Sequence, residues 1–175
     1  MDPHSSTVEV CDGEQAEPLA EEVFAVYDAV FGDHPDMAEW RAELYDKHAA
    51  RDGFRLALAR DDDRLVGFAW GYVGRRGQYW SDWVVRELPA EVTDSWVGGH
   101  FEFVELAVLE DSRRHGLGRR LHDALLDGVP SDRALLSTDN HDSPAVRLYS
   151  SHGWVRLGEL SPQAQVMGLR LPAGL

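Results

Sequence analysis

The sequence predicts a mixed α/β fold in which the whole chain, residues 1–175, forms one domain of about seven strands and about four helices. Apolar side chains recur at two-residue spacing in some segments and at helical spacing in others, and glycine or proline separates many of these segments. With 43% apolar and 10% aromatic residues, the chain can bury one substantial core and does not require a second. The predicted order is strand, two helices, three strands, helix, strand, helix and two strands.

A strand and two helices are expected near the N-terminus. Residues 7–12 (TVEVCD) alternate polar and apolar side chains, which is typical of a strand. Residues 19–31 repeat leucine and valine at helical spacing, and a glycine and a proline follow where this helix should end. Residues 36–50 predict a second helix, for which the Asp36 side chain is a suitable N-cap.

A hairpin and a further strand are expected in the middle of the chain. The apolar runs 54–60 and 65–73 flank the polar turn DDDR, an arrangement typical of two antiparallel strands. The next segment, 74–99, is polar and irregular, and we expect only one or two helical turns in it, at 81–88. Residues 101–109 (FEFVELAVL) predict the strand that follows.

Two helices and three strands are expected in the last part of the chain. Residues 116–129 repeat leucine on one helical face, and Gly128 and Pro130 mark the end of this helix. Residues 133–139 (RALLSTD) predict a buried strand, and residues 143–153 predict a short helix with Ser143 as its N-cap. Two closing strands are predicted at 154–160 and 165–171.

The charge balance excludes several kinds of partner. The chain has 31 acidic and 17 basic residues, a formal net charge of −14, so its electrostatic field repels nucleic acids and anionic membranes. It begins without a basic and apolar leader and contains no run of about 18 apolar residues, so we expect a cytoplasmic protein without membrane contact. The single cysteine, Cys11, cannot form an internal disulfide, and the histidines are not spaced as metal ligands.

Residues 112–121 (SRRHGLGRRL) concentrate four arginines at the predicted start of a helix. Helix N-termini have free N–H groups and the positive end of the dipole, so arginines are unfavourable there unless an anion offsets them. Gly116 and Gly118 allow close approach of a ligand to the backbone, and we expect a pyrophosphate at this loop. Dinucleotide-binding and Walker patterns do not fit, because Leu121 replaces the third glycine and no Gly-Lys-Ser/Thr follows. Pairing of the arginines with neighbouring carboxylates is the alternative.

Two segments together resemble the GNAT-type N-acetyltransferase superfamily, VELAVLEDSRRHGLGRRLHDALL (104–126) and DSPAVRLYSSHGW (142–154). The first contains the family's Arg/Gln-x-x-Gly-x-Gly/Ala loop, and the second is similar to its Asn-x-x-Ala-x-x-Leu-Tyr pattern, with Asp142 in place of asparagine. The resemblance implies a central mixed, mostly antiparallel sheet and acetyl-CoA as the acyl-donor co-substrate. It also implies the following contacts with acetyl-CoA: Ala107, Val108, Arg113, Arg114, His115, Gly116, Leu117, Gly118, Arg119, Asn140 and Ser143.

The resemblance further implies direct attack of an amine on the thioester carbonyl of acetyl-CoA. A carboxylate is expected to take the amine's proton, because an alkylamine with a pKa of about 10.4 is protonated at neutral pH. The family often places this carboxylate on the strand before the cofactor loop, where Glu102 and Glu105 lie, and we prefer Glu102. Because Glu102 and Glu105 are three positions apart on a strand, their side chains point to opposite faces unless a bulge lies between them. The resemblance implies such a bulge near 106–108. The family's tyrosine, here Tyr149, acts as the general acid for the departing thiolate.

The sequence leaves several acceptors open. The aromatic residues Tyr79, Trp80, Trp83 and Trp96 are expected either to cover the acceptor site or to pack in the core or across a homodimer. The acidic charge favours a cationic acceptor, because long-range attraction raises encounter rates. We therefore expect an N-acetyltransferase that acts on a primary amine of a small molecule. The alternatives are a protein or peptide acceptor and a non-catalytic acyl-CoA-binding regulatory domain.

Overall fold

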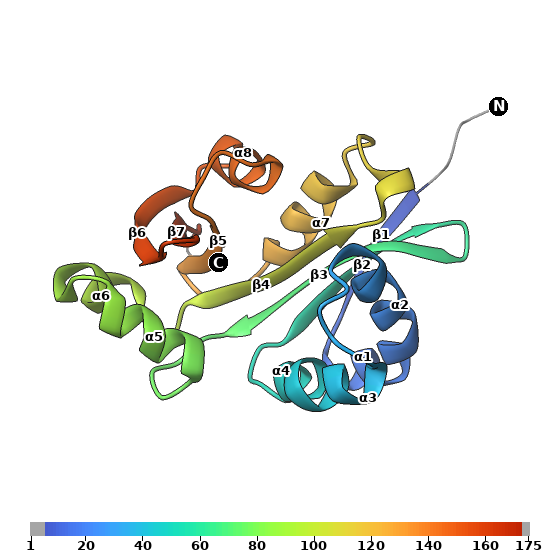
Figure 1. The fold of residues 1–175 in the computed structure, drawn as a ribbon, viewed down its shortest axis with the longest axis horizontal. Coiled ribbons are helices and arrows are strands. Elements are labelled where there is room, and N and C mark those ends of the chain that lie inside the picture. The colour runs from blue at the N-terminus through green and yellow to red at the C-terminus, as the bar shows by residue number, and fades with distance from the viewer. Residues whose placement is uncertain (1–5, 173–175) are drawn as a thin grey trace. The chain divides into compact units, whose positions relative to one another are not determined.

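Residues 6–172 are described by a computed structural model. The chain divides into unit 1, formed by the residues up to Tyr72 and by Glu105–Asp127, and unit 2, formed by Val73–Val104 and the residues from Gly128 onward. Figure 1 shows the succession of helices and strands along the chain. Strand β4 (Phe101–Val108) begins in unit 2 and ends in unit 1. Within residues 6–172, no helix has the length and apolar character that a membrane span requires.

Three antiparallel strands form the sheet of unit 1, as the alternating pattern of the first segment and the two apolar runs predicted. They are β1 (Ser6–Cys11), β2 (Arg55–Asp61) and β3 (Arg64–Val73). Leu58 of β2 lies opposite Phe68 of β3, and both are buried. The second half of β4 follows β3, and the N–H of Leu109 donates to the carbonyl of Val66 at 2.8 Å just after β4 ends. The predicted hairpin and the predicted strand after it are therefore confirmed.

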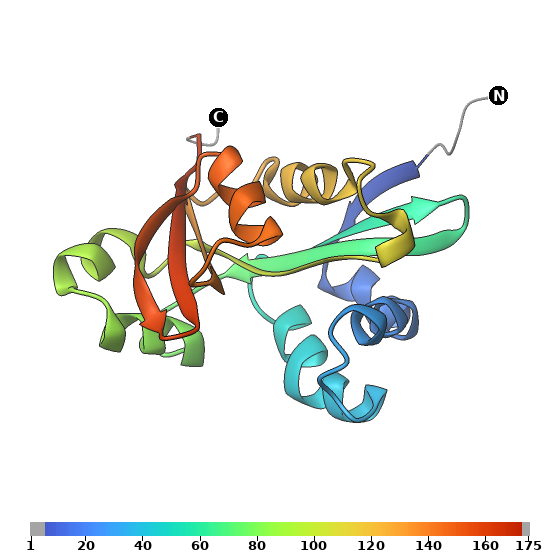
Figure 2. The ribbon, with the colours of Figure 1, turned by 45° about the horizontal axis from the view of Figure 1, so that its top comes forward.

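Helices cover both faces of this sheet. Figure 2 shows α7 (Leu117–Leu126) on one face and the N-terminal helices on the other. The N-terminal helices are α1 (Gly13–Ala16), η1 (Glu17–Leu19), α2 (Ala20–Val30), α3 (Met37–Trp40), the π-helical turn η2 (Arg41–Tyr45) and α4 (Asp46–Ala49). Asp36 caps α3 as predicted, accepting from the N–H of Glu39 at 2.9 Å. The predicted leucine stripe of α7 is buried, at Leu117, Leu121 and Leu125.

Aromatic rings fill the core between the sheet and the N-terminal helices of unit 1. The rings of Trp40 and Tyr45 stack with 4.7 Å between their centroids, and those of Phe68 and Trp70 stack with 5.3 Å. Tyr27 of α2 contacts Trp40 at 5.5 Å and is 3% exposed. Because buried aromatic rings contribute large apolar areas, these contacts fix the helices against β3.

Unit 2 contains the first half of β4 and three further strands, β5 (Arg133–Asp139), β6 (Val155–Ser161) and β7 (Ala164–Arg170). β4 and β5 pair in parallel, with Phe101 opposite Ala134. β7 lies antiparallel between β5 and β6. The strand order in the described part of the chain is β1-β2-β3-β4-β5-β7-β6, seven strands in all. The prediction of a mixed, mostly antiparallel sheet is confirmed.

Three helices belong to unit 2, α5 (Tyr79–Glu87), α6 (Ala90–Trp96) and α8 (Pro144–Ser151). α5 contains the helical turns expected at 81–88, whereas the expectation that the rest of 74–99 is irregular was wrong, because α6 forms there. Val84 of α5 and the following Leu88 join a buried cluster with Leu135 and Leu160. Burial against β5 and β6 stabilises helices that are too short to be stable alone.

Candidate active site

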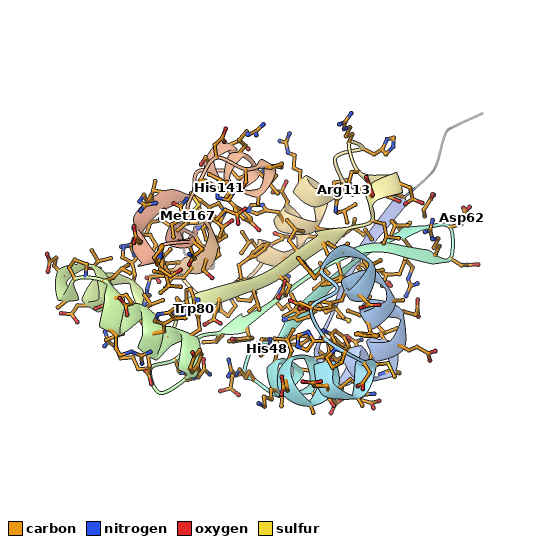
Figure 3. The ribbon with its side chains drawn as sticks, viewed as in Figure 1. His48, Asp62, Trp80, Arg113, His141 and Met167 are labelled. Atoms are coloured by element: carbon orange, nitrogen blue, oxygen red, sulfur yellow. The ribbon has the colours of Figure 1, made fainter. Side chains whose placement is uncertain are left out.

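The loop between β4 and α7 carries the predicted phosphate-binding residues and belongs to unit 1. It begins with a short turn, η3 (Glu110–Ser112), and continues through residues 113–116, all of them exposed. Arg114 and Gly116 have φ angles of 69° and 75°, in the left-handed region that is costly for arginine and easy for glycine. Arg113 lies on this loop (Figure 3) and donates from Nε to the carbonyl of Val108 at 3.0 Å. The loop is therefore sharply turned and tied to the end of β4.

The first turn of α7 is suited to an anion. Gly116 is the N-cap residue, none of the described side chains caps the helix there, and the first turn contains no acidic residue. A Cβ atom at Gly116 would meet no heavy atom of the described chain within 4 Å, so a ligand can approach the backbone. The first N–H groups of the helix, at Leu117, Gly118 and Arg119, have no intrahelical acceptor. This donor set fits the pyrophosphate of acetyl-CoA.

The four arginines of the cluster separate into two groups. Arg113, Arg114 and Arg119 are exposed around the loop. Arg119 also lies 4.0 Å from a carboxylate one turn later in α7, which is a weak contact at an exposed position. Arg120 instead donates from its guanidinium to the carbonyl of Ser6 at 2.9 Å and ties α7 to β1. The cations available to a phosphate at this loop are therefore Arg113, Arg114 and Arg119.

The end of β4 lies close to β3. A Cβ atom at Gly67 would come within 2.9 Å of the carbonyl oxygen of Ala107, so only glycine fits there without a shift of the strands. Ala107 is buried, and Val108 is partly exposed. The backbone of these two residues, expected to contact the pantetheine arm, is thus held firmly next to the phosphate loop.

Glu105 is a half-buried carboxyl group on the part of β4 that belongs to unit 1. Burial, with the negative charge of Asp33 adding to it, raises the pKa of Glu105 to about 8. Partial desolvation by itself would raise the pKa of Asp33. Hydrogen bonds of 2.9 Å with the Tyr27 hydroxyl and with Nδ1 of His34 outweigh this effect and lower the pKa. Burial is the largest cause of the raised pKa of Tyr27, and the negative charge of Glu105 raises it further. Asp33 therefore stays ionised, while Glu105 can exchange its proton near neutral pH.

Replacing Glu105 with glutamine is expected to stabilise the protein near pH 8 and much less near pH 5. Between the ordinary pKa of 4.5 and the folded value of about 8, the folded state holds a proton that the unfolded state has lost, so stability falls as pH rises. The loss accumulates at up to about 1.4 kcal/mol per pH unit, and glutamine, which does not titrate, avoids it. Thermal unfolding of both proteins across this range measures the difference, and a pH-independent difference in Tm would contradict the raised pKa.

Glu102 lies on the part of β4 that belongs to unit 2 and is 5% exposed. Its Oε1 atom lies 3.6 Å from Nε2 of His100, a residue that is completely buried. The Nδ1 atom of His100 accepts a hydrogen bond from the N–H of Gly98 at 3.1 Å. The two candidate bases therefore differ in environment, since Glu105 lies half-buried under the influence of a carboxylate and Glu102 lies buried beside an imidazole.

Tyr149 lies on α8 within an aromatic group of unit 2 and is 7% exposed. Its ring meets Phe103 of β4 at 5.9 Å and Trp154 at 5.8 Å between centroids, both edge-on. Ser143 caps α8 as predicted, because its hydroxyl accepts from the N–H of Val146 at 3.2 Å. The cap and the aromatic contacts together fix the position of the Tyr149 ring.

The residues before α8 have partners within unit 2. Asn140 bonds with two side chains of β6, donating to a glutamate at 3.3 Å and accepting from an arginine at 2.5 Å. Asp142 lies 3.1 Å from Nε of Arg147 on α8. To contact acetyl-CoA, the side chains of Asn140 and Ser143 would have to bind it in addition to their present partners. Both contacts stay predictions from the family resemblance.

The tryptophans before β4 pack within unit 2. Trp80, Trp83 and Trp96 lie against the buried cluster of α5, β5 and β6. Trp80, on α5 (Figure 3), also donates from Nε1 to the hydroxyl of Ser137 at 3.2 Å. Tyr79 differs from them, being 77% exposed. Core packing therefore accounts for the three tryptophans, and an acceptor contact stays open for Tyr79.

Three residues near the candidate bases were not predicted: Tyr27, Asp33 and His100. Tyr27 and Asp33 lie at the end of α2 and in the loop after it, and no sequence spacing relates them to β4. For His100 a signal existed. It stands two positions before Glu102, and residues two apart on a strand point to the same face.

Residues 20–154 match the sequence family described as Acetyltransferase (GNAT) family. The GCN5-like protein acetyltransferase Rv2170 of Mycobacterium tuberculosis is 36% identical over 98 residues, which cover 51% of this chain and 48% of the relative. The mycothiol acetyltransferase of Thermobispora bispora is 32% identical over 132 residues, which cover 72% of this chain and 39% of the relative. The chain thus spans less than half the length of these curated relatives.

Three solved structures share the fold at low sequence identity. An acetyltransferase from Thermus thermophilus has a TM-score of 0.66 at 16% identity, covering 97% of this chain and 100% of that one. The ribosomal-protein-S18-alanine N-acetyltransferase of Escherichia coli has a TM-score of 0.63 at 15% identity, with coverages of 97% and 96%. An aminoglycoside 6'-acetyltransferase type Ii has a TM-score of 0.65 at 18% identity, with coverages of 95% and 98%.

Proposed function

The chain belongs to the acetyltransferase (GNAT) family, and we propose that it is an N-acetyltransferase that moves the acetyl group of acetyl-CoA to a primary amine of a small molecule. The family makes the protein an acetyltransferase, whereas the amine and the small size of the acceptor are the proposal. The observation that carries it is Glu105, a half-buried carboxyl group with a pKa of about 8 on the strand that leads into the phosphate loop. Such a group is suited to take a proton from an amine.

Acetyl-CoA supplies an activated acetyl group in the form of a thioester. Arg113, Arg114 and Arg119 would hold its pyrophosphate together with the N–H groups at the start of α7, because no carboxylate occupies the first turn of that helix. The exposed His115 lies on the same loop, and the buried Leu117 anchors the loop in the core of unit 1. The loop thereby provides binding and orientation, which the transfer requires before any proton moves.

Glu105 is proposed as the proton acceptor. An alkylamine acceptor arrives protonated, and a base is most efficient when its pKa is close to the working pH. Glu102, preferred from the sequence, is 5% exposed, whereas Glu105 is more accessible and has a pKa raised to about 8. We therefore assign the role of proton acceptor to Glu105 and keep Glu102 as the alternative acceptor, to be tested beside it.

Replacing Tyr149 with phenylalanine is expected to lower turnover about tenfold to a hundredfold, because the departing thiolate loses its proton donor. The Kd for acetyl-CoA should change little, since the ring keeps its contacts with Phe103 and Trp154. Release of free thiol measures turnover, and calorimetry measures Kd. An unaltered turnover would remove the acid role from Tyr149.

The choice of a small cationic amine is supported by charge and by the names of relatives. The formal charge of −14 attracts cations. A mycothiol acetyltransferase and an aminoglycoside 6'-acetyltransferase are among the similar proteins, and both names refer to small molecules. The relative named as a protein acetyltransferase supports a second candidate, an amine on a protein or peptide. The family match disfavours the non-catalytic alternative.

An acceptor panel tests the proposal. Polyamines, aminoglycosides and amino sugars are compared with peptides that carry a free N-terminus or lysine, each with acetyl-CoA and the native protein. Acetylation of small amines, seen by mass spectrometry together with thiol release, supports the proposal. Acetylation of the peptides alone would favour the second candidate.

A further inference from the structure

Asp33 carries a negative charge that the proposed transfer does not use. It lies in the loop after α2, and its Oδ1 atom accepts hydrogen bonds of 2.9 Å from the Tyr27 hydroxyl and from Nδ1 of His34. Because an ionised carboxylate only accepts, Nδ1 of His34 carries a proton. The N–H of Asp33 itself adds a further contact with the carboxylate. These contacts, all within unit 1, fix the direction of the carboxylate.

The Asp33 carboxylate is able to bind a ligand as well. Its side chain is 59% exposed, and a carboxylate can accept about four hydrogen bonds, more than the described residues supply. Partial desolvation opposes ionisation of Asp33, but its hydrogen bonds outweigh this effect and lower its pKa. At neutral pH the group is therefore a permanent anion. It is suited to bind a cation and unsuited to take a proton from one.

Two neighbours in unit 1 suit the other parts of an alkylamine. Burial raises the pKa of Glu105 to about 8, and the charge of Asp33 adds to this effect, so the two carboxyl groups interact. Phe31, at the C-cap of α2, is 41% exposed, and its ring meets that of Tyr27 with 4.9 Å between the centroids. The group around Tyr27 thus combines an oriented anion, a candidate proton acceptor and an exposed apolar ring.

We propose that Asp33 is the residue that selects a cationic acceptor, because its carboxylate binds the ammonium group that is to be acetylated. The inference rests on the proposed acetyl transfer to an amine and assigns the acceptor's charge to one partner. Asp33 holds the ammonium group while Glu105 takes a proton from it. A bound cation also favours the ionised form of Glu105, so binding of the acceptor prepares the base.

Replacing Asp33 with asparagine is expected to raise the KM for an alkylamine acceptor about threefold to tenfold, because the ammonium group loses its counter-charge. The rise should shrink when the salt concentration increases from about 0.1 M to about 1 M, since salt screens the attraction in the native chain. A change in packing would not respond to salt in this way. A rise of the same size at both salt concentrations, or no rise at all, would overturn the proposal.

Asp28→Asn is the matched control, because it removes the same charge from an exposed position of α2. The control should leave the KM for the amine within about twofold of the native value. The Kd for acetyl-CoA should be native in both variants. Equal rises of KM in Asp28→Asn and Asp33→Asn would overturn the proposal, since the overall charge of the chain would then explain them.

Tyr27→Phe tests whether the orientation of the carboxylate matters. The variant keeps the ring and removes the hydroxyl that donates to Asp33, so the KM for the amine is expected to rise about twofold to threefold. In the Asp33→Asn background the same substitution should add little, because the hydroxyl acts through that carboxylate. A rise of equal size with and without Asp33 would contradict the arrangement.

A measurement without acetyl transfer separates this inference from the proposed function. The dimethylbutylammonium ion is a protonated tertiary amine that carries the charge of an acceptor and forms no stable amide. Carbon NMR of labelled glutamate side chains follows the titration of Glu105, whose signal is identified by its loss in Glu105→Gln. The probe is expected to lower the pKa of Glu105 in the native chain and not in Asp33→Asn.

The two readouts together distinguish the possible failures. If amines are acetylated and the probe does not act through Asp33, the cation site is wrong while the proposed function stands. If the probe acts through Asp33 and no amine is acetylated, the acceptor role of Asp33 is overturned together with the proposed function.

Discussion

Replacing Gly118 with glutamate is expected to weaken acetyl-CoA binding by about a hundredfold or more, because it sets a negative charge against the phosphates at short range. Gly118 lies in the first turn of α7, where the N–H groups would meet the pyrophosphate. The same carboxylate suits a helix N-terminus, so the free energy of unfolding should be equal or higher. Calorimetry and thermal unfolding together should therefore show a loss of binding without a loss of stability.

Two further variants separate charge from bulk at this position. Gly118→Ala adds a methyl group without charge and is expected to bind acetyl-CoA more tightly than Gly118→Glu does. Ala42→Glu adds the same charge at an exposed helical position of unit 1 and should leave binding unchanged. If Gly118→Glu binds acetyl-CoA as the native chain does, the phosphate assignment of this loop is wrong.

Replacing Glu105 with glutamine is expected to lower kcat/KM for the amine about a hundredfold to a thousandfold near pH 8, because the amine loses its proton acceptor. The acceptor amine also titrates with pH, but the ratio of native to variant kcat/KM cancels that effect. This ratio should rise about tenfold per pH unit below the Glu105 pKa of about 8 and level off above it, since only the ionised carboxylate accepts a proton.

Two matched variants decide between the candidate bases. Glu43→Gln changes an exposed glutamate of unit 1 and should behave as the native chain at every pH. Glu102→Gln should not reproduce the pH-dependent ratio. If the ratio of native to variant kcat/KM were independent of pH for Glu105→Gln and rose with pH for Glu102→Gln, Glu102 would be the proton acceptor instead.

Local signals in the sequence predicted much of the fold and the helix starts at the candidate site. Asp36 and Ser143 cap the helices whose starts they were expected to mark, because a cap depends only on residues three positions away. Gly116, at the start of α7, adopts a left-handed conformation that glycine reaches without strain. The turn before α7 was predictable for the same reason, since its glycines and the helix start are contiguous in the sequence.

Other features depend on residues that are distant in the sequence. α5 and α6 have little apolar pattern of their own, and residues of β5, β6 and β7 complete their hydrophobic cluster. The raised pKa of Glu105 needs burial by the fold and the charge of Asp33. The orientation of His100 needs the turn at Gly98 and the space at Gly74. Patterns of spacing do not contain these tertiary contacts.

Transfer of the acetyl group of acetyl-CoA to an amine is tested most directly by mass spectrometry of the amine panel after incubation with acetyl-CoA, with the native chain and Gly118→Glu compared side by side. At least one amine is expected to be acetylated by the native chain and none above background by the variant. A native chain that binds acetyl-CoA but acetylates no amine, small or peptidic, would contradict it.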